Sequence, residues 1–429
     1  MADHLRSRDN PTSRPDDGYS SRPQIGAQPP QRSPVSGSDD DNNDRDLEEG
    51  KGPEPGAGAT GTGAEADAQQ QQEGEEEIRV SRLATEFYTV SHLILFSILG
   101  TLARLGLQAL TFYPGAPIAF SSVWPNFAGS LVMGFLSEDR RLFRHEWGVP
   151  RFDRQHQQQQ KSAEVAAGVP SPSESEQQLA AELEAAKKAH LATKKTIPLY
   201  IGLATGFCGS FTSFSSFVRD AFLATSNDLP SPDLAPASAS LPRSGGRSFM
   251  ALAAVPIATV SLSLSGLRIG AHLAAALGRA TPSLPPRLTR RVLDPLAALL
   301  AWGCWLGAAL LSALPPDRFA AEETWRGSAT FALVFAPLGC LLRFYASLRL
   351  NPRVASFPLG TFAVNVFGAA VLAMAWDLAH VPLGRVVGCQ VLQGVEDGFC
   401  GALTTVSTWV AELAGLRRRQ ADYGGSEME

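Results

Sequence analysis

The chain has 429 residues, and its mean hydropathy near zero with 44% hydrophobic residues would suit a soluble protein. This average combines two unlike regions, because residues 1–78 are rich in Pro, Gly, Gln, Asp and Glu whereas long blocks after Val90 are nearly free of charge. The net charge of −5 comes mostly from the first region, so it indicates neither a nucleic-acid partner nor an acidic substrate.

Residues 1–89 are predicted to form a disordered N-terminal tail. The segment Gly56–Gly61 fits the dinucleotide-binding pattern G-x-G-x-x-G, but no apolar strand precedes it and no amphipathic helix follows it. A solvated low-complexity segment is therefore the favoured interpretation. Because the first apolar stretch begins about ninety residues into the chain, we expect it to be a membrane anchor rather than a secretory signal.

Apolar stretches follow, most of them long enough to cross the hydrocarbon core of a bilayer, which takes about 20 helical residues. They are predicted at 90–112, 117–137, 197–225, 248–277, 293–314, 327–348, 356–379 and 384–415. The third and eighth are interrupted by Gly, Ser and Thr, a composition that suits a helix broken where it lines a cavity inside the protein. Residues 145–195 are predicted to form a polar loop with a short surface helix at 179–190.

Arginine and lysine residues predict the orientation of these spans. They cluster before the first span, between spans two and three, between four and five, between six and seven, and after the eighth. All of these clusters fall on one side of the membrane if the N-terminus is cytoplasmic, in agreement with the positive-inside rule. Span one then runs outward and span six inward, because the single helix at 293–314 reverses the direction.

An internal repeat relates the two sides of that helix. Gly100-x-x-x-Arg104 and Asn126-x-x-Gly129 recur, at one common offset, as Gly339-x-x-x-Arg343 and Asn365-x-x-Gly368, and Gly206–Phe217 recurs as Gly398–Trp409. Two copies inserted in opposite senses form an inverted repeat, and transport sites commonly lie between such repeats. The predicted fold is an all-α polytopic membrane protein with two inverted four-helix-type repeats, at 90–277 and 327–418, a linking transmembrane helix, and a polar C-terminus at 419–429.

The two motifs together resemble the CrcB/Fluc family of fluoride channels, and the two-copy arrangement with a linking helix resembles the eukaryotic fluoride exporters called FEX. The resemblance covers about 90–418. It implies a passive, fluoride-selective channel, in which the two halves form an intramolecular pseudo-dimer within the lipid bilayer. The plasma membrane is the expected location. Fluoride that enters a cell as HF is trapped as the anion, so a passive exit suffices for fluoride resistance. No nucleic-acid partner is expected.

Fluoride is small and strongly hydrated, so its pore must replace water with hydrogen-bond donors and positive aromatic edges. The resemblance implies pore-lining roles for Asn126, Asn365, Phe214 and Phe217. From the residues alone, such asparagines equally serve to bond helices together, and aromatic residues three apart more often pack. A hydroxyl track is expected from Ser213, Ser215, Thr405 and Ser407, with bonding back to helix carbonyls as the alternative.

The resemblance also implies a structural sodium ion in the helix breaks, held by the carbonyls of Gly209, Thr212, Gly401 and Thr404. Such carbonyls near a pseudo-twofold axis would otherwise lack partners in hydrocarbon. Arg104 and Arg343 are expected to attract anions at the aqueous mouths, with snorkelling to the membrane interface as the alternative.

The second half departs from the family pattern in two respects. Val406 and Trp409 stand where the first half has Phe214 and Phe217, so one working pore is expected. By the repeat, a ninth span is also missing after Arg417–Arg419. A pore in the first half predicts that Asn126→Ala or Phe214→Ala abolishes fluoride resistance and leaves membrane insertion intact.

Two other functions stay open from the sequence. A proton-coupled transporter for another small anion would use Glu396 or Asp397, although solvated carboxylates are the simpler interpretation at the start of a span. A non-conducting truncated paralogue would keep the fold without a pore. Enzymatic activity is not expected, because the sequence offers no nucleophile–base–orienter set and no metal-ligand cluster among its seven histidines.

Overall fold

The computed structural model describes residues 82–113, 116–118, 120–144, 192–229, 243–314, 326–354, 356–381 and 386–415. These residues form helices and loops without a strand, which confirms the all-α prediction. Within them, six helices are long and apolar enough to cross a membrane, as expected of a polytopic membrane protein. The predicted tail up to residue 81, the predicted surface helix at 179–190 and the polar C-terminus lie outside the described residues.

The membrane-length helices match most of the predicted spans. They cover Leu83–Thr111, Pro198–Ser226, Gly245–Arg279, Pro286–Ala313, Ala329–Arg353 and Leu359–His380. The first of them, α2 (Arg82–Thr111), begins eight residues before the predicted start at residue 90. Its first two turns contain Arg82 and Glu86 among apolar residues, so a boundary drawn from apolarity alone falls too late.

Two predicted spans are absent from this set for reasons of length and continuity. The stretch at 117–137 forms α3 (Val123–Glu138), which has only 16 residues. The stretch at 384–415 is divided into α14 (Val386–Gly394), η7 (Val395–Cys400), α15 (Gly401–Leu403) and a helix over 407–415. The non-helical residues 404–406, between α15 and the helix over 407–415, are the interruption that the Gly, Ser and Thr residues predicted.

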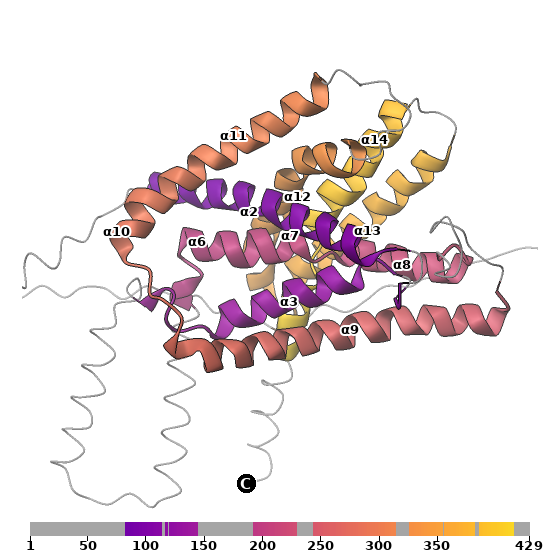
Figure 1. The fold of residues 1–429 in the computed structure, drawn as a ribbon, viewed down its shortest axis with the longest axis horizontal. Helices are drawn as coiled ribbons and strands as arrows, with labels where there is room; N and C mark the ends of the chain where they lie inside the picture. The colour runs from indigo at the N-terminus through magenta and orange to yellow at the C-terminus, as the bar shows by residue number, and fades with distance from the viewer. Residues whose placement is uncertain are drawn as a thin grey trace, which may run out of the picture. The chain divides into compact units, whose positions relative to one another are not determined.

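Helix α9 (Gly245–Ala276) covers α3 along its length (Figure 1). Small residues allow the two backbones to approach closely, because a methyl group built on Gly266 would lie 2.6 Å from the Phe127 carbonyl oxygen. A methyl group on Gly270 would overlap the Leu131 carbonyl in the same way. This spacing of glycines four apart is a common packing device between membrane helices.

The corresponding face of α13 (Leu359–His380) has no such cover among the described residues. Val366 and Met374, which the repeat aligns with Phe127 and Phe135 of α3, are 51% and 57% exposed. The two halves therefore differ in how their asparagine-bearing helix is packed.

The linking helix α11 (Asp294–Ala313), reached through α10 (Pro286–Leu288) and η4 (Thr289–Leu293), lies beside α2 (Figure 1). The indole nitrogen of Trp302 donates to the Ser91 hydroxyl at 3.2 Å, and His92 Nε2 lies 3.5 Å from the Asp294 carboxylate. Polar contacts of this kind specify where an otherwise apolar helix docks.

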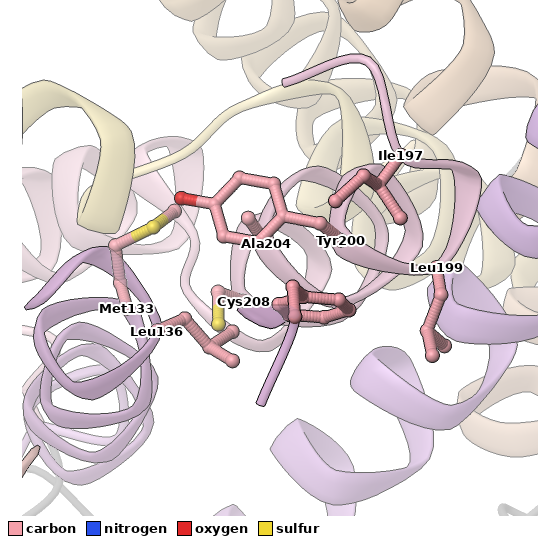
Figure 2. Packing of buried hydrophobic residues seen from close by; sticks show 8 residues of the cluster. Met133, Leu136, Ile197, Leu199, Tyr200, Ala204 and Cys208 are labelled. Carbon is pink, nitrogen blue, oxygen red and sulfur yellow. The ribbon is translucent and has the colours of Figure 1, made fainter. Parts of the chain in front are cut away.

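A buried apolar cluster holds α3 against the start of the first broken helix, α6 (Pro198–Ile201) and η2 (Gly202–Cys208) (Figure 2). Met133 and Leu136 contribute from α3, while Tyr200, Ala204 and Cys208 contribute from the broken helix. This packing fixes the position of the first break relative to α3.

Candidate functional site

Two helices are broken at matching positions of the two halves. In the first half, η2 and α7 (Gly209–Phe211) end at Thr212, whose backbone is extended at φ −90° and ψ 150°. In the second half, η7 and α15 end at Thr404, which has φ −93° and ψ 154°. A π-helical segment precedes each break, and such segments frequently occur at functional sites.

An asparagine binds the backbone at each break. Asn126, on α3, accepts a hydrogen bond from the Ser213 amide at 2.8 Å and donates to the Ser213 carbonyl at 3.4 Å. Asn365, on α13, accepts from the Thr405 amide at 2.9 Å and donates to the Thr405 carbonyl at 3.1 Å. Each asparagine thus bonds two helices together, and its NH₂ group, which has two N–H donors, keeps one donor beyond this pairing.

The threonine at each break binds the opposite half. The Thr212 hydroxyl accepts from the amides of Val406 at 3.2 Å and Ser407 at 3.1 Å, and the Thr404 hydroxyl accepts from the Ser215 amide at 2.9 Å. Each threonine therefore caps the helix that restarts in the other half, namely 407–415 or α8 (Phe214–Ser226). The two broken helices are joined where they cross.

The four hydroxyl side chains expected to form a track are all buried: Ser213, Ser215, Thr405 and Ser407. Ser215 donates to the Cys400 carbonyl and Ser407 to the Cys208 carbonyl, each at 3.2 Å. These bonds reach carbonyls, as the alternative interpretation predicted, but the carbonyls belong to the opposite half rather than to the same helix. A role in ion conduction stays a prediction for these hydroxyls.

A pocket of about 190 Å³ joins the two halves. Its lining consists of Phe214, Phe357, Pro358, Phe362, Asn365, Val366, Trp409, Glu412 and Leu413. The rings of Phe214 and Trp409 lie 5.3 Å apart and nearly perpendicular, at 83°. One pocket therefore combines an aromatic pair and an asparagine amide, with Phe214 from the first half and the other two groups from the second.

Phe217 lies outside this pocket. Its ring is 5.4 Å from that of Phe214, and it belongs to a buried cluster with Ala224, Leu229 and, from α9, Val255, against which Phe214 also packs. The two phenylalanines therefore share this cluster, but Phe214 also lines the pocket and Phe217 does not.

A family model described as CrcB-like protein, Camphor Resistance (CrcB), matches residues 91–240 and 330–426 of the chain. The chain belongs to the CrcB-like family. Each matched segment contains one copy of the repeated motifs, and the first ends at 240, before the predicted fourth span at 248–277.

Several relatives of this CrcB-like chain carry functional names. Fluoride export protein 1 of Neurospora crassa is 62% identical over 360 residues, which are 82% of this chain and 65% of that protein. Fluoride export protein 1 of Candida albicans is 32% identical over 75% of this chain and 71% of that protein. The fluoride-specific ion channel FluC of Acinetobacter baylyi is 40% identical over 21% of this chain and 68% of that protein. This chain thus spans less than two thirds of the N. crassa relative, and no solved structure matches it significantly.

The residues at the breaks fit the sodium ion implied by resemblance to CrcB-like channels. An unbroken helix would direct the Ser213 amide to the Gly209 carbonyl and the Ser216 amide to the Thr212 carbonyl. Instead these amides donate to Asn126 and to the Ser213 hydroxyl. The second half diverts the amides of Thr405 and Thr408 from the carbonyls of Gly401 and Thr404 in the same way. Backbone carbonyls released in unwound membrane helices are ligands for Na⁺.

Both arginines of the CrcB-like repeats are buried, with 1% of Arg104 and 2% of Arg343 exposed. Arg343 donates to the carbonyls of Ala402 at 2.9 Å and Thr205 at 2.8 Å, and Arg104 donates to the Asp397 carbonyl. These contacts place the guanidinium groups inside the protein. Snorkelling would instead have placed them at the membrane interface. The attraction of anions by these arginines stays a prediction.

Each of these arginines also lies against a glycine of the opposite half. A methyl group built on Gly209 would overlap the Arg343 guanidinium, and one built on Gly401 would overlap that of Arg104. The glycine after Cys in each motif is therefore needed for a close approach between side chain and backbone.

Glu412 is a pocket residue that the sequence interpretation missed. It accepts a hydrogen bond from the Thr361 hydroxyl at 2.8 Å, and its second carboxylate oxygen is buried without a partner among the described residues. Asp220 of the first half, buried at 3% exposure, likewise accepts from the Ser122 amide at 3.0 Å. An ionisable residue inside a membrane span is itself a signal of function, and it was available from the sequence.

The interpretation of Glu396 and Asp397 as solvated carboxylates is wrong. They are 4% and 7% exposed and face Arg219, whose Nη1 lies 3.3 Å from Glu396 and 3.9 Å from Asp397. The described helix begins with α14 at Val386, so Glu396 and Asp397 lie about three turns inside it rather than at its end.

Proposed function

We propose that this chain is a fluoride channel through which cytoplasmic fluoride leaves passively. The observation that carries the proposal is the pocket shared by Asn365, Phe214 and Trp409. An amide N–H and the positive edge of an aromatic ring both stabilise a small anion after it loses water. The pocket lining contains no Lys or Arg. A fixed cation would hold fluoride too tightly for rapid release, so this chemistry favours conduction over storage.

The chain keeps one such aromatic pair, which supports one working pore. At the pseudo-symmetric position, Val406 stands where Phe214 stands in the first half. The surroundings of Asn126 therefore lack the second aromatic ring. We place the conducting pore at Asn365 and expect the Asn126 side to contribute stability.

The two halves are proposed to be inverted in the plasma membrane, with the N-terminus in the cytoplasm. Mirrored hydrogen bonds at the two breaks support this pseudo-dimer, and the distribution of Arg and Lys supports the orientation. A structural sodium ion would be held by the carbonyls of Gly209, Thr212, Gly401 and Thr404. Labelling of single cysteines placed at residue 381 and at 353 from either side of the membrane tests the orientation.

The direct test is fluoride efflux from liposomes that contain the purified chain. The vesicles are loaded with potassium fluoride, valinomycin carries the compensating potassium, and a fluoride electrode records the release. We expect release without a pH gradient. No release above that of empty liposomes would overturn the proposal.

Phe214→Leu sharpens this test, with Phe222→Leu as its control on the same helix. Phe222 is 56% exposed and lines neither the pocket nor the breaks. Loss of the ring edge at Phe214 is expected to lower efflux about tenfold, which corresponds to the 0.5–1.5 kcal/mol typical of an aromatic contact at its upper end. The control is expected to retain efflux.

A proton-coupled anion transporter is the second candidate, and Glu412 is the observation that favours it. Its carboxyl group lies in the lining beside Asn365, where it could accept a proton during transport. This function requires that efflux follow an imposed pH gradient and stop when the gradient is removed. A channel shows no such requirement.

A further inference from the structure

The segment that follows α3 packs against the connection between α9 and α11. The Leu284 amide of that connection donates to the Leu142 carbonyl at 2.9 Å. Leu142, Leu284 and Leu293 pack on one buried cluster, to which Phe143 and Ile197 belong. The segment after α3, the start of the first broken helix and the connection before α11 therefore meet at one place (Figure 1).

Exposed arginines lie on two of these converging segments. Three follow α3 and three belong to the connection between α9 and α11: Arg140, Arg141, Arg144, Arg279, Arg287 and Arg291. These six arginines are termed the basic surface. Because the two segments are more than a hundred residues apart in the chain, packing rather than one run of sequence brings their positive charges together.

Nearby acids do not balance this charge. Asp139 is 2% exposed and accepts hydrogen bonds from the amides of Arg141 at 3.4 Å and Leu142 at 2.8 Å, so it serves the turn after α3. The connection from Leu277 to Leu293 contains no acidic residue, and the partly exposed Glu138 is one acid beside six arginines. Among the described residues, no carboxylate lies within ion-pair distance of the basic surface.

The basic surface lies at the ends of membrane-length helices. The span Pro198–Ser226 begins beside it, the span Gly245–Arg279 ends in it, and the span Pro286–Ala313 begins in it. Lipid headgroups lie where spanning helices leave the hydrocarbon core. An arginine presents a planar fork of N–H donors that matches the oxygens of a phosphate group. The chemistry and the location of the basic surface therefore both suit a phospholipid headgroup.

We propose that the basic surface binds the headgroups of anionic phospholipids in the adjacent leaflet of the membrane. In the proposed orientation this is the cytoplasmic leaflet, which carries the anionic lipids. Clusters of about four to eight basic residues next to membrane helices bind such lipids. This binding goes beyond the proposed function and does not depend on fluoride conduction.

The positive-inside rule alone also places arginines on this side, but it makes a different prediction. The rule concerns the direction in which helices are inserted, and that direction is already set in the purified protein. A headgroup site, by contrast, binds anionic lipid after purification. Lipid binding by purified protein in a neutral detergent therefore separates the two explanations.

The full chain is titrated in detergent with phosphatidylserine, and mass spectrometry of the intact protein counts the bound lipids. Phosphatidylcholine is the neutral probe and inorganic phosphate the soluble anion. We expect phosphatidylserine to bind more tightly than either, and added salt to weaken it. R141Q/R287Q removes one arginine from each segment and is expected to lower the affinity about tenfold, whereas R141K/R287K keeps the charges and should retain most of it.

R349Q/R353Q is the matched control. It also removes two exposed arginines at the end of a membrane-length helix, Ala329–Arg353, but neither belongs to the basic surface. Its affinity for phosphatidylserine is expected to equal that of the unmodified chain. Size-exclusion elution and melting temperature show whether each variant is folded.

Several outcomes overturn the proposal. Equal binding of phosphatidylserine and phosphatidylcholine does so, and so does unchanged affinity in folded R141Q/R287Q. An equal loss in R349Q/R353Q would show that total charge matters rather than this surface, and equally tight binding of inorganic phosphate would assign the surface to a soluble anion. If R141Q/R287Q fails to fold, R144Q/R279Q is judged by the same criteria. Fluoride efflux is not read here, so failure of lipid binding and failure of the channel are distinguishable.

Discussion

Replacing each asparagine at the helix breaks by alanine separates structural bonding from conduction. Asn126 and Asn365 make the same two backbone hydrogen bonds, to Ser213 and Thr405 respectively. Each substitution leaves at least one buried amide without an acceptor, whereas the Ser213 carbonyl still accepts from the Phe217 amide at 3.4 Å. At about 1–3 kcal/mol per unsatisfied group, each variant loses at least about 1 kcal/mol of stability.

The two variants should differ in conduction although both lose stability. Only Asn365 lines the pocket with Phe214 and Trp409. We therefore expect Asn365→Ala to lower fluoride efflux at least tenfold in folded protein and Asn126→Ala to retain at least half of it. A pore in the first half predicts the opposite for Asn126→Ala, namely a loss of fluoride resistance.

The assay is valinomycin-coupled fluoride efflux from liposomes, with melting temperature in detergent as the measure of stability. Equal loss of efflux in both variants would refute the assignment of a single pore. Normal efflux from Asn365→Ala would refute the role of the pocket altogether.

Two further predictions concern packing and pH. Gly401→Ala is expected to lower the melting temperature, because its new methyl group overlaps the buried Arg104 guanidinium, whereas Gly303→Ala, with nothing within 4 Å of the new atom, should not. Lys194, in the short helical segment 192–194 before α6, donates to the Leu136 carbonyl at 3.0 Å, and its burial, partly offset by nearby Asp139, lowers its pKa from 10.5 to about 8. The unfolded chain then binds more protons than the folded one between these values, so the unfolding free energy should rise from about pH 8 to 10.5. Thermal melts across this range should show the rise in the unmodified chain and a smaller one in Lys194→Met, and equal slopes would contradict the assignment.

The sequence predicted the features that depend on local composition. Apolar length identified the membrane helices, and Gly, Ser and Thr within an apolar span identified the broken ones, because such residues are unfavourable in a helix that faces lipid. The repeat also led directly to Asn126, Asn365, Arg104 and Arg343. Apolar length predicted a full membrane span at 117–137, but the helix formed there, α3, is too short to cross a membrane by itself. It is supported by α9 through close contact at Gly266.

The amino-acid sequence by itself determined that this is a CrcB-like membrane protein with two related halves and a helix break in each, since periodicity, apolar length and motif order are properties of the chain. Tertiary structure decided which residues act together. Phe214 is close to Phe217 in sequence, yet it shares its pocket with Asn365 and Trp409 of the other half. Glu396 and Asp397 are buried beside Arg219 of the other half, at 3.3 Å and 3.9 Å. Contacts between the halves join residues far apart in the chain, and no local pattern records such distances.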